Sequence, residues 1–172
     1  HVMARRQRQM CIRDSNSSGG NTPSDNTAVG CNAGRSVSYG DNGTYIGSAA
    51  GTSVTTASDN TFVGFNAGTA TTTGGQNTAV GSGALDTNVT GIGNTAVGFE
   101  ALFTMTGTRN VAVGSGAGKL TDTGGSNTFI GFNSATANTS GGSNVAIGSR
   151  VFESNTVGAV SYTHLTLPTS HN

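Results

Sequence analysis

Short alternations of apolar and polar residues recur along the chain. The string NTAVG occurs three times, and TYIG, NTFVG, NVAVG, NTFIG and NVAIG supply five close variants. The glycines that end these strings are 17 residues apart, with one step of 16. Near-constant spacing of this length predicts a stack of coils, each made of short strands and turns. The turn glycines are Gly30, Gly47, Gly64, Gly81, Gly98, Gly114, Gly131 and Gly148.

The residue before each of these glycines is valine or isoleucine in every copy. Because β-branched residues suit a pleated, half-buried surface, we predict that this column forms the buried ladder of the core. Threonine or valine two places earlier shares its face, and the intervening column is then expected to face outward. The predicted core ladder consists of Val29, Ile46, Val63, Val80, Val97, Val113, Ile130 and Ile147.

Aromatic residues occur in the predicted outward column and directly after three of the glycines. Exposed aromatics in a row indicate a partner surface, and a second copy of the chain is the simplest partner under cyclic symmetry. The candidate interface consists of Tyr45, Phe62, Phe65, Phe99, Phe129 and Phe132.

An asparagine precedes most of the strands, for example Asn60, Asn77 and Asn94. Two arrangements are open: an amide ladder in which each side chain bonds to the next coil, or a turn residue bonded only to its own backbone. The predicted fold is an all-β parallel β-solenoid, or β-roll, of about eight 17-residue coils that assembles as a trimer. At roughly 4.8 Å per coil, the rod is roughly 35–40 Å long.

The two ends of the chain do not follow the repeat. RRQRQMCIRDS (Arg5–Ser15) and VSYTHLTLPT (Val160–Thr169) correspond to opposite strands of one DNA string, which resembles a transposase-type sequencing-library adapter. We therefore expect residues 1–15 to be an adapter-like, non-native leader and residues 16–153 to be the β-solenoid domain. Residues 154–172 are then a short linker and an adapter-like, non-native tail, and the chain is a fragment of a longer protein.

Between these ends the chain has four basic and seven acidic residues, one cysteine (Cys31) and no histidine. A nucleic-acid partner requires a concentrated basic surface, which is missing. Most nucleophile–base arrangements are also excluded, so we expect no enzyme activity, cofactor or metal site. An apolar run of membrane-spanning length is absent, which predicts no membrane insertion of this fragment.

Two local patterns suggest chemistry and have simpler explanations. The string GSGAGK (Gly114–Lys119) has the glycines of a phosphate loop but lacks its Lys-Ser/Thr ending, and it lies in the ordinary repeat register. Asp41 and Asp59 lie near a coil junction and could approach each other around a metal, or could be solvated turn residues.

NVAIG (Asn144–Gly148) and NTAVGFEAL (Asn94–Leu102) resemble the head repeats of trimeric autotransporter adhesins, the YadA-like head repeats. The longer NTAVGSGALDTNVTGIGNTAVGFEAL resembles repeat regions of phage tail fibres. The resemblance covers nearly all of the repeat and implies a left-handed β-roll of three identical chains, although adhesin repeats are usually shorter. It implies a structural segment of a tail fibre or adhesin, a rigid spacer and binding shaft. Such a segment is extracellular, on a virion tail or bacterial surface, and its partner is a host-cell receptor, glycan or matrix.

Threonines recur near one point of successive coils, at Thr55–Thr56, Thr71–Thr73, Thr104/Thr106 and Thr121/Thr123. Flat threonine arrays on β-solenoids are used by some ice-binding proteins, so an ice-binding or other flat-surface solenoid is the alternative function. The simpler explanation is that threonine suits exposed strands and turns.

Overall fold

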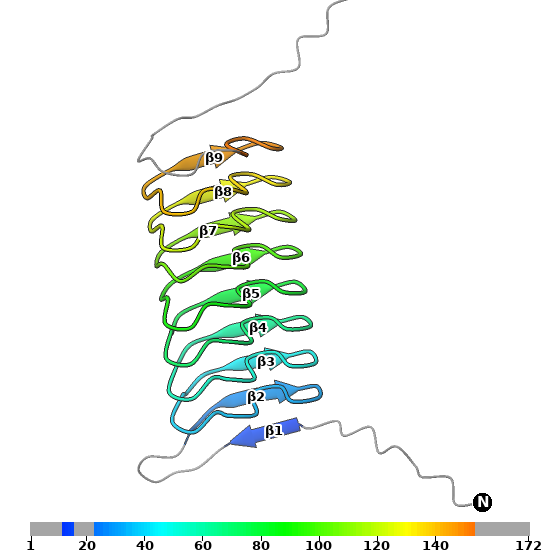
Figure 1. Cartoon of the computed structure of the whole chain (residues 1–172). Helices are drawn as coiled ribbons and strands as arrows, with labels where there is room; N and C mark the ends of the chain where they lie inside the picture. Colours follow the sequence, from blue (N-terminus) through cyan, green and yellow to red (C-terminus); the bar gives the residue numbers. More distant parts are fainter. Residues whose placement is uncertain (1–11, 16–22, 154–172) are drawn as a thin grey trace, which may run out of the picture.

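The computed structural model describes residues 12–15 and 23–153, and it has one strand in each level of a rod (Figure 1). Eight parallel strands, β2 to β9, form a β-solenoid of about seven turns, which confirms the predicted all-β parallel β-solenoid. The described residues contain no helix. The strands are β1 (Ile12–Ser15), β2 (Asn26–Val29), β3 (Thr44–Ile46), β4 (Thr61–Val63), β5 (Thr78–Val80), β6 (Thr95–Val97), β7 (Val111–Val113), β8 (Thr128–Ile130) and β9 (Val145–Ile147).

Strand β1 differs from the others because it pairs antiparallel with β2, with Ile12 opposite Val29. It falls within residues 1–15, which the sequence sets apart from the repeat. The other residues of that leader, and the whole predicted tail at 154–172, lie outside the described residues.

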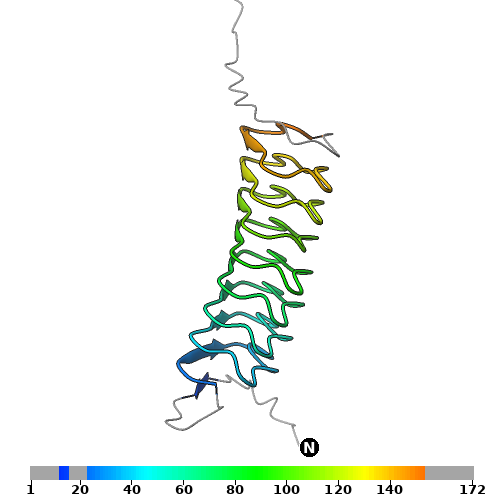
Figure 2. The same ribbon diagram turned by 90° about the vertical axis from the view of Figure 1, so that its left-hand side faces the viewer.

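The register between coils is constant, and the strands line one wall of the rod (Figure 2). The backbone ladder continues through the turns, where the Gly34 N–H donates to the Ala50 carbonyl and the Gly51 N–H to the Ala67 carbonyl, both at 2.9 Å. In the single shorter step, Thr95 lies opposite Val111, so the strand register is kept there too. Each whole coil, and not only its strand, is therefore bonded to its neighbours.

The core lies on the opposite face of the strands from the one that the sequence predicts. Tyr45, Phe62 and Phe129 are fully buried, as are the alanines of the same column in β5, β6, β7 and β9. The predicted core ladder is wrong: the Val/Ile column points out of the coil, and five of its members are 37–40% exposed. These are Ile46, Val80, Val113, Ile130 and Ile147; the other three, Val29, Val63 and Val97, are half-buried.

The narrow interior explains this choice of face. Opposite Tyr45 and Phe62 the wall carries glycine, Gly51 and Gly68: a Cβ on Gly68 would lie 2.5 Å from the Phe62 ring. In β5 and β6, where the strand carries Ala79 and Ala96, the wall carries the buried leucines Leu85 and Leu102. Close packing requires the side-chain volumes across each layer to compensate in this way. A column of only valine and isoleucine has no such compensation and lies outside.

The eight turn glycines end the strands with φ between 129° and 141°. Only glycine adopts this backbone region readily. Space also requires glycine, because an added Cβ on any of them except Gly148 would overlap the carbonyl of the equivalent glycine in the next coil. Coil stacking and strand ending therefore depend on the same residue.

The leading asparagines bond to the next coil, so the own-backbone alternative is wrong. The Asn60 Oδ1 accepts from the Asn77 N–H at 2.9 Å, and its Nδ2 donates to the Gly74 carbonyl at 3.0 Å. Direct amide–amide bonds also occur, as from Asn110 Nδ2 to Asn94 Oδ1 at 3.1 Å. These side chains are buried, so they satisfy backbone groups that water does not reach.

We predict that Asn94→Ala lowers the free energy of unfolding by about 2–4 kcal/mol, because it leaves two backbone groups, one buried and one half-buried, without their hydrogen-bond partner. These are the Asn110 N–H, bonded to Asn94 Oδ1 at 3.0 Å, and the Gly107 carbonyl, bonded to Asn94 Nδ2 at 2.9 Å. Urea denaturation followed by circular dichroism measures the change. Thr73→Ala, on an exposed turn, is the control. Equal stability of the two variants would contradict a structural role for the amide ladder.

We predict that stability falls as pH rises from 10 towards 12. Desolvation by burial raises the pKa of Tyr45 to about 12 from 10.0, so the unfolded chain loses this proton first. The loss approaches about 2–3 kcal/mol. Tyr45→Phe should abolish the fall, and should add up to about 1 kcal/mol at neutral pH because the hydroxyl has no hydrogen-bond partner among the described residues. Denaturation at several pH values measures this change in the free energy of unfolding. Tyr39→Phe is the control and should retain the decrease at high pH.

Candidate functional site

Polar groups near the coil junctions bond between coils. The Asp41 Oδ1 accepts from the Ser24 N–H at 2.8 Å, and the Asp59 Oδ1 accepts from Asn42 Nδ2 at 3.0 Å. Within the described part of the chain, no three His, Cys, Asp or Glu residues come together in a way that could hold a metal ion. No helix there could cross a membrane. The structure thus gives both aspartates a role in coil stacking.

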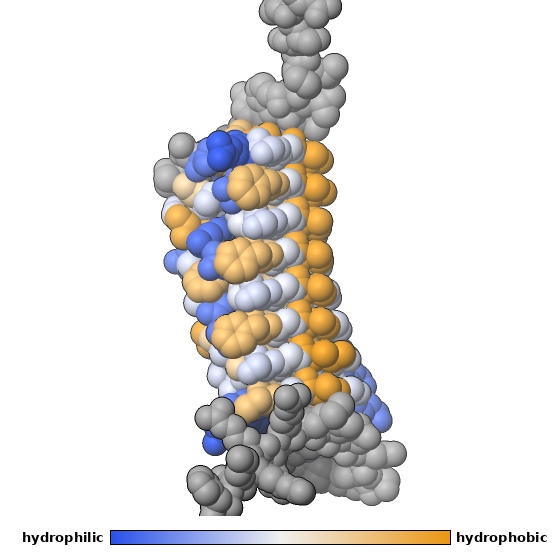
Figure 3. All heavy atoms as spheres, turned by 90° about the vertical axis from the view of Figure 1, so that its right-hand side faces the viewer, coloured by the Kyte–Doolittle hydropathy of each residue, from blue (hydrophilic) through white to orange (hydrophobic). Residues whose placement is uncertain are grey.

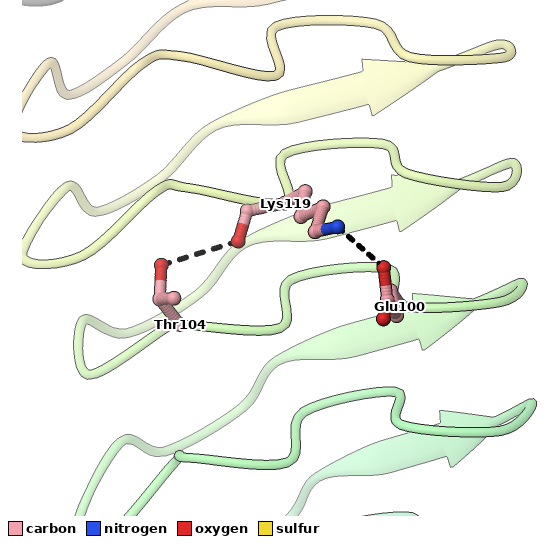
Figure 4. Close-up of polar contacts among 3 residues, drawn as sticks. All are labelled: Glu100, Thr104 and Lys119. Carbon is pink, nitrogen blue, oxygen red and sulfur yellow. Dashed lines mark hydrogen bonds and ion pairs between the residues drawn. The ribbon is translucent and has the colours of Figure 1, made fainter.

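The GSGAGK string follows the ordinary path of its coil. The Lys119 ammonium forms an ion pair with the Glu100 carboxylate at 2.6 Å (Figure 4). The Lys119 carbonyl accepts from the Thr104 hydroxyl at 3.1 Å. Both contacts join this coil to the one before it, so the lysine is engaged within the rod.

The threonines of the predicted array do not form one exposed surface. Thr71 and Thr121 are buried, and the hydroxyls of Thr55 and Thr72 donate to backbone carbonyls of the next coil at 3.1 and 3.2 Å. Much of this column is therefore engaged in coil stacking.

A continuous apolar stripe runs along the strands on the outside of the rod. Figure 3 shows it as an unbroken hydrophobic column. It contains the residues that the sequence predicted for the core. They lie on the surface because the opposite face of each strand is the buried one. We call this the Val/Ile stripe: Val29, Ile46, Val63, Val80, Val97, Val113, Ile130 and Ile147.

A second apolar feature lies just after the turn glycines. Phe65, Phe99 and Phe132 are 50–58% exposed and belong to alternate coils, with serine at this position in the coils between. We call these three residues the Phe row; Figure 3 shows the alternation as separate patches beside the continuous column. The structure thus divides the six residues of the candidate interface. The Phe row is exposed, whereas Tyr45, Phe62 and Phe129 are buried in the core. The prediction that these three buried residues belong to an interface is wrong.

A surface pocket of about 240 Å³ lies between two members of the Phe row. Burial raises the pKa of the Asp86 carboxyl, and a hydrogen bond with the Thr69 side chain opposes that shift. The sequence does not single out this pocket, because its residues come from different repeat positions on three coils. It is lined by Phe65, Asn66, Ser82, Gly83, Asp86, Phe99, Glu100 and Phe103.

The Val/Ile stripe, the Phe row and its pocket are the candidate functional surfaces among the described residues. Comparisons of the chain with protein-family models, with curated proteins and with solved structures find no match.

Proposed function

We propose that the chain is a structural segment of a surface fibre, a rigid shaft that assembles as a homotrimer through the Val/Ile stripe. The fibre stands on a phage tail or a bacterial cell and serves as a spacer and as a surface for a host-cell receptor, glycan or matrix. The observation that carries this proposal is that the stripe lies on the outer face of all eight parallel strands, with five members exposed and three half-buried.

The stripe suits contact between identical chains. Burying apolar surface contributes roughly 25 cal/mol per Å², and long exposed apolar patches on soluble proteins commonly mark contact sites. Its members recur at one position per coil, in the same register throughout. Chains aligned side by side about an axis parallel to the rod bring equivalent levels together, as cyclic symmetry requires.

The shaft role follows from how the rod resists bending. Backbone hydrogen bonds join every coil to the next, in the turns as well as the strands, and asparagine side chains add hydrogen bonds at most of these junctions. Bending the rod would open several of these bonds at one level. Such a rod holds surface groups at fixed spacing, which suits a spacer and binding shaft.

We predict that Val80→Asp combined with Val113→Asp converts a trimer into a folded monomer, because a close trimer contact would bury the new charges without partners. Light scattering gives the mass, and circular dichroism checks the fold. Val89→Asp is the control, since Val89 is 42% exposed but lies off the strands. A wild-type chain that is monomeric at all concentrations would reject the trimer.

A second candidate function is an ice-binding or other flat-surface solenoid that acts as a monomer. The observation in its favour is the outer strand face, where threonines such as Thr44, Thr61 and Thr78 stand beside the Val/Ile stripe in constant register. This face, and not the turn array considered from sequence, is the regular one. Parallel pairing repeats its side chains about every 4.8 Å.

If this second candidate holds, the monomer shows thermal hysteresis and Thr78→Tyr abolishes it, because the larger ring interrupts the regular face. Thr73→Tyr, in an exposed turn, should leave the hysteresis unchanged. Nanolitre osmometry on the wild-type chain decides the question. Absence of hysteresis in the folded monomer would reject the candidate.

A further inference from the structure

We propose that the Phe row and the pocket between Phe65 and Phe99 bind a neutral, extended β-1,4-linked glycan chain lying along the rod. The proposal rests on the proposed surface role and deepens it by naming a ligand class.

The spacing of the Phe row carries the proposal. Successive members are two coils apart, which places equivalent ring positions about 9.6 Å apart. In an extended β-1,4-linked glycan, successive sugars face opposite ways, so the same sugar face recurs with every second residue. The length of such a disaccharide is close to the two-coil spacing of the rings. The strand register is constant across these coils, so the same coil spacing recurs from Phe65 to Phe99 and from Phe99 to Phe132.

The ring chemistry suits this ligand. The face of a phenylalanine ring carries partial negative charge, and the axial C–H groups of a β-linked hexose carry partial positive charge. The three rings are each at least half exposed. The Phe65 and Phe99 side chains are therefore available as stacking platforms. The Arg150 guanidinium already lies over the Phe132 ring, 5.9 Å from its centroid, so a sugar on that ring face has to displace it.

Polar groups beside the rings can bind the hydroxyls. A polar residue follows each phenylalanine: Asn66, Glu100 and Asn133. In the coils between, this pair of positions is Ser-Gly, at Ser82–Gly83 and Ser115–Gly116. The small residues leave a recess between large rings, which differs from the unbroken Val/Ile stripe and favours a ligand with alternating apolar and polar groups over a second protein chain.

The recess between Phe65 and Phe99 is the principal subsite. The Asp86 and Glu100 carboxylates on its wall accept hydrogen bonds from hydroxyls. The Asp86 carboxylate would repel an anionic sugar, whereas the charge of Glu100 is paired with Lys119, so the proposed ligand is neutral. The equivalent recess between Phe99 and Phe132 is more occupied: Lys119 pairs with Glu100 there, and the Asn133 Oδ1 lies against Gly116.

Isothermal titration of the full chain with cellohexaose tests the proposal, with maltohexaose, whose α-linked chain curves, as the comparison ligand. We expect cellohexaose to bind and maltohexaose to bind at least about tenfold more weakly. Phe99→Ala, which removes the central ring, should weaken cellohexaose binding at least about tenfold. The matched control is Tyr39→Ala, which removes an exposed aromatic residue from another part of the coil and should change nothing.

The proposal is overturned if folded wild-type chain does not bind cellohexaose, if the two glycans bind equally, or if folded Phe99→Ala binds as well as wild type. Light scattering on the same samples separates it from the fibre proposal. A trimer without glycan binding overturns the glycan site alone, whereas a monomer that binds cellohexaose overturns the trimer alone. If Phe99→Ala dissociates a trimer and leaves glycan binding unchanged, the Phe row belongs to self-association and the glycan site is rejected.

Discussion

The stacking of whole coils in one constant register is the constraint on which the rest of the structure depends. The turn glycine fixes it, because any side chain there would meet the backbone of the next coil, and the asparagine amides fix it from within. Once every coil repeats its neighbour's path, each repeat position becomes a straight column. The inner columns must then share a narrow space, and the outer columns become surfaces with a set spacing.

Much of the fold could be predicted from the repeat, because the repeat period, the strand positions and the turn glycines can all be identified in the sequence. The inner face of the strands could not be predicted from residue type alone. The alternation of side chains along a strand shows that neighbouring columns face opposite ways, but it does not show which column is inside. Hydrophobicity favoured the valine and isoleucine column over the column that is mostly alanine, and so predicted the wrong face. A usable signal in the four coils that begin at β3 to β6 was the exchange of sizes six residues apart, Tyr45 with Gly51 against Ala79 with Leu85. Only an enclosed column requires such compensation.

The surface features were predictable to a lesser degree. The exposure of Phe65 and Phe99 followed from their place after the turn glycines. The pocket between them did not, because Asp86 and Glu100 occupy different positions of the repeat and meet only where one coil's turn lies over the next. Repeat-by-repeat alignment separates such residues, so contacts between non-equivalent columns become visible only in the structure.

The alternation of phenylalanine and serine after the turn glycines has a consequence for how such a chain can lengthen by gene duplication. Copying a single coil would preserve the backbone register but place two phenylalanines, or two serines, on adjacent levels. Copying two coils preserves both the register and the alternation. The unit of inheritance for this surface is therefore a pair of coils, whereas the unit for the fold is one, and the two levels of repetition can be selected separately.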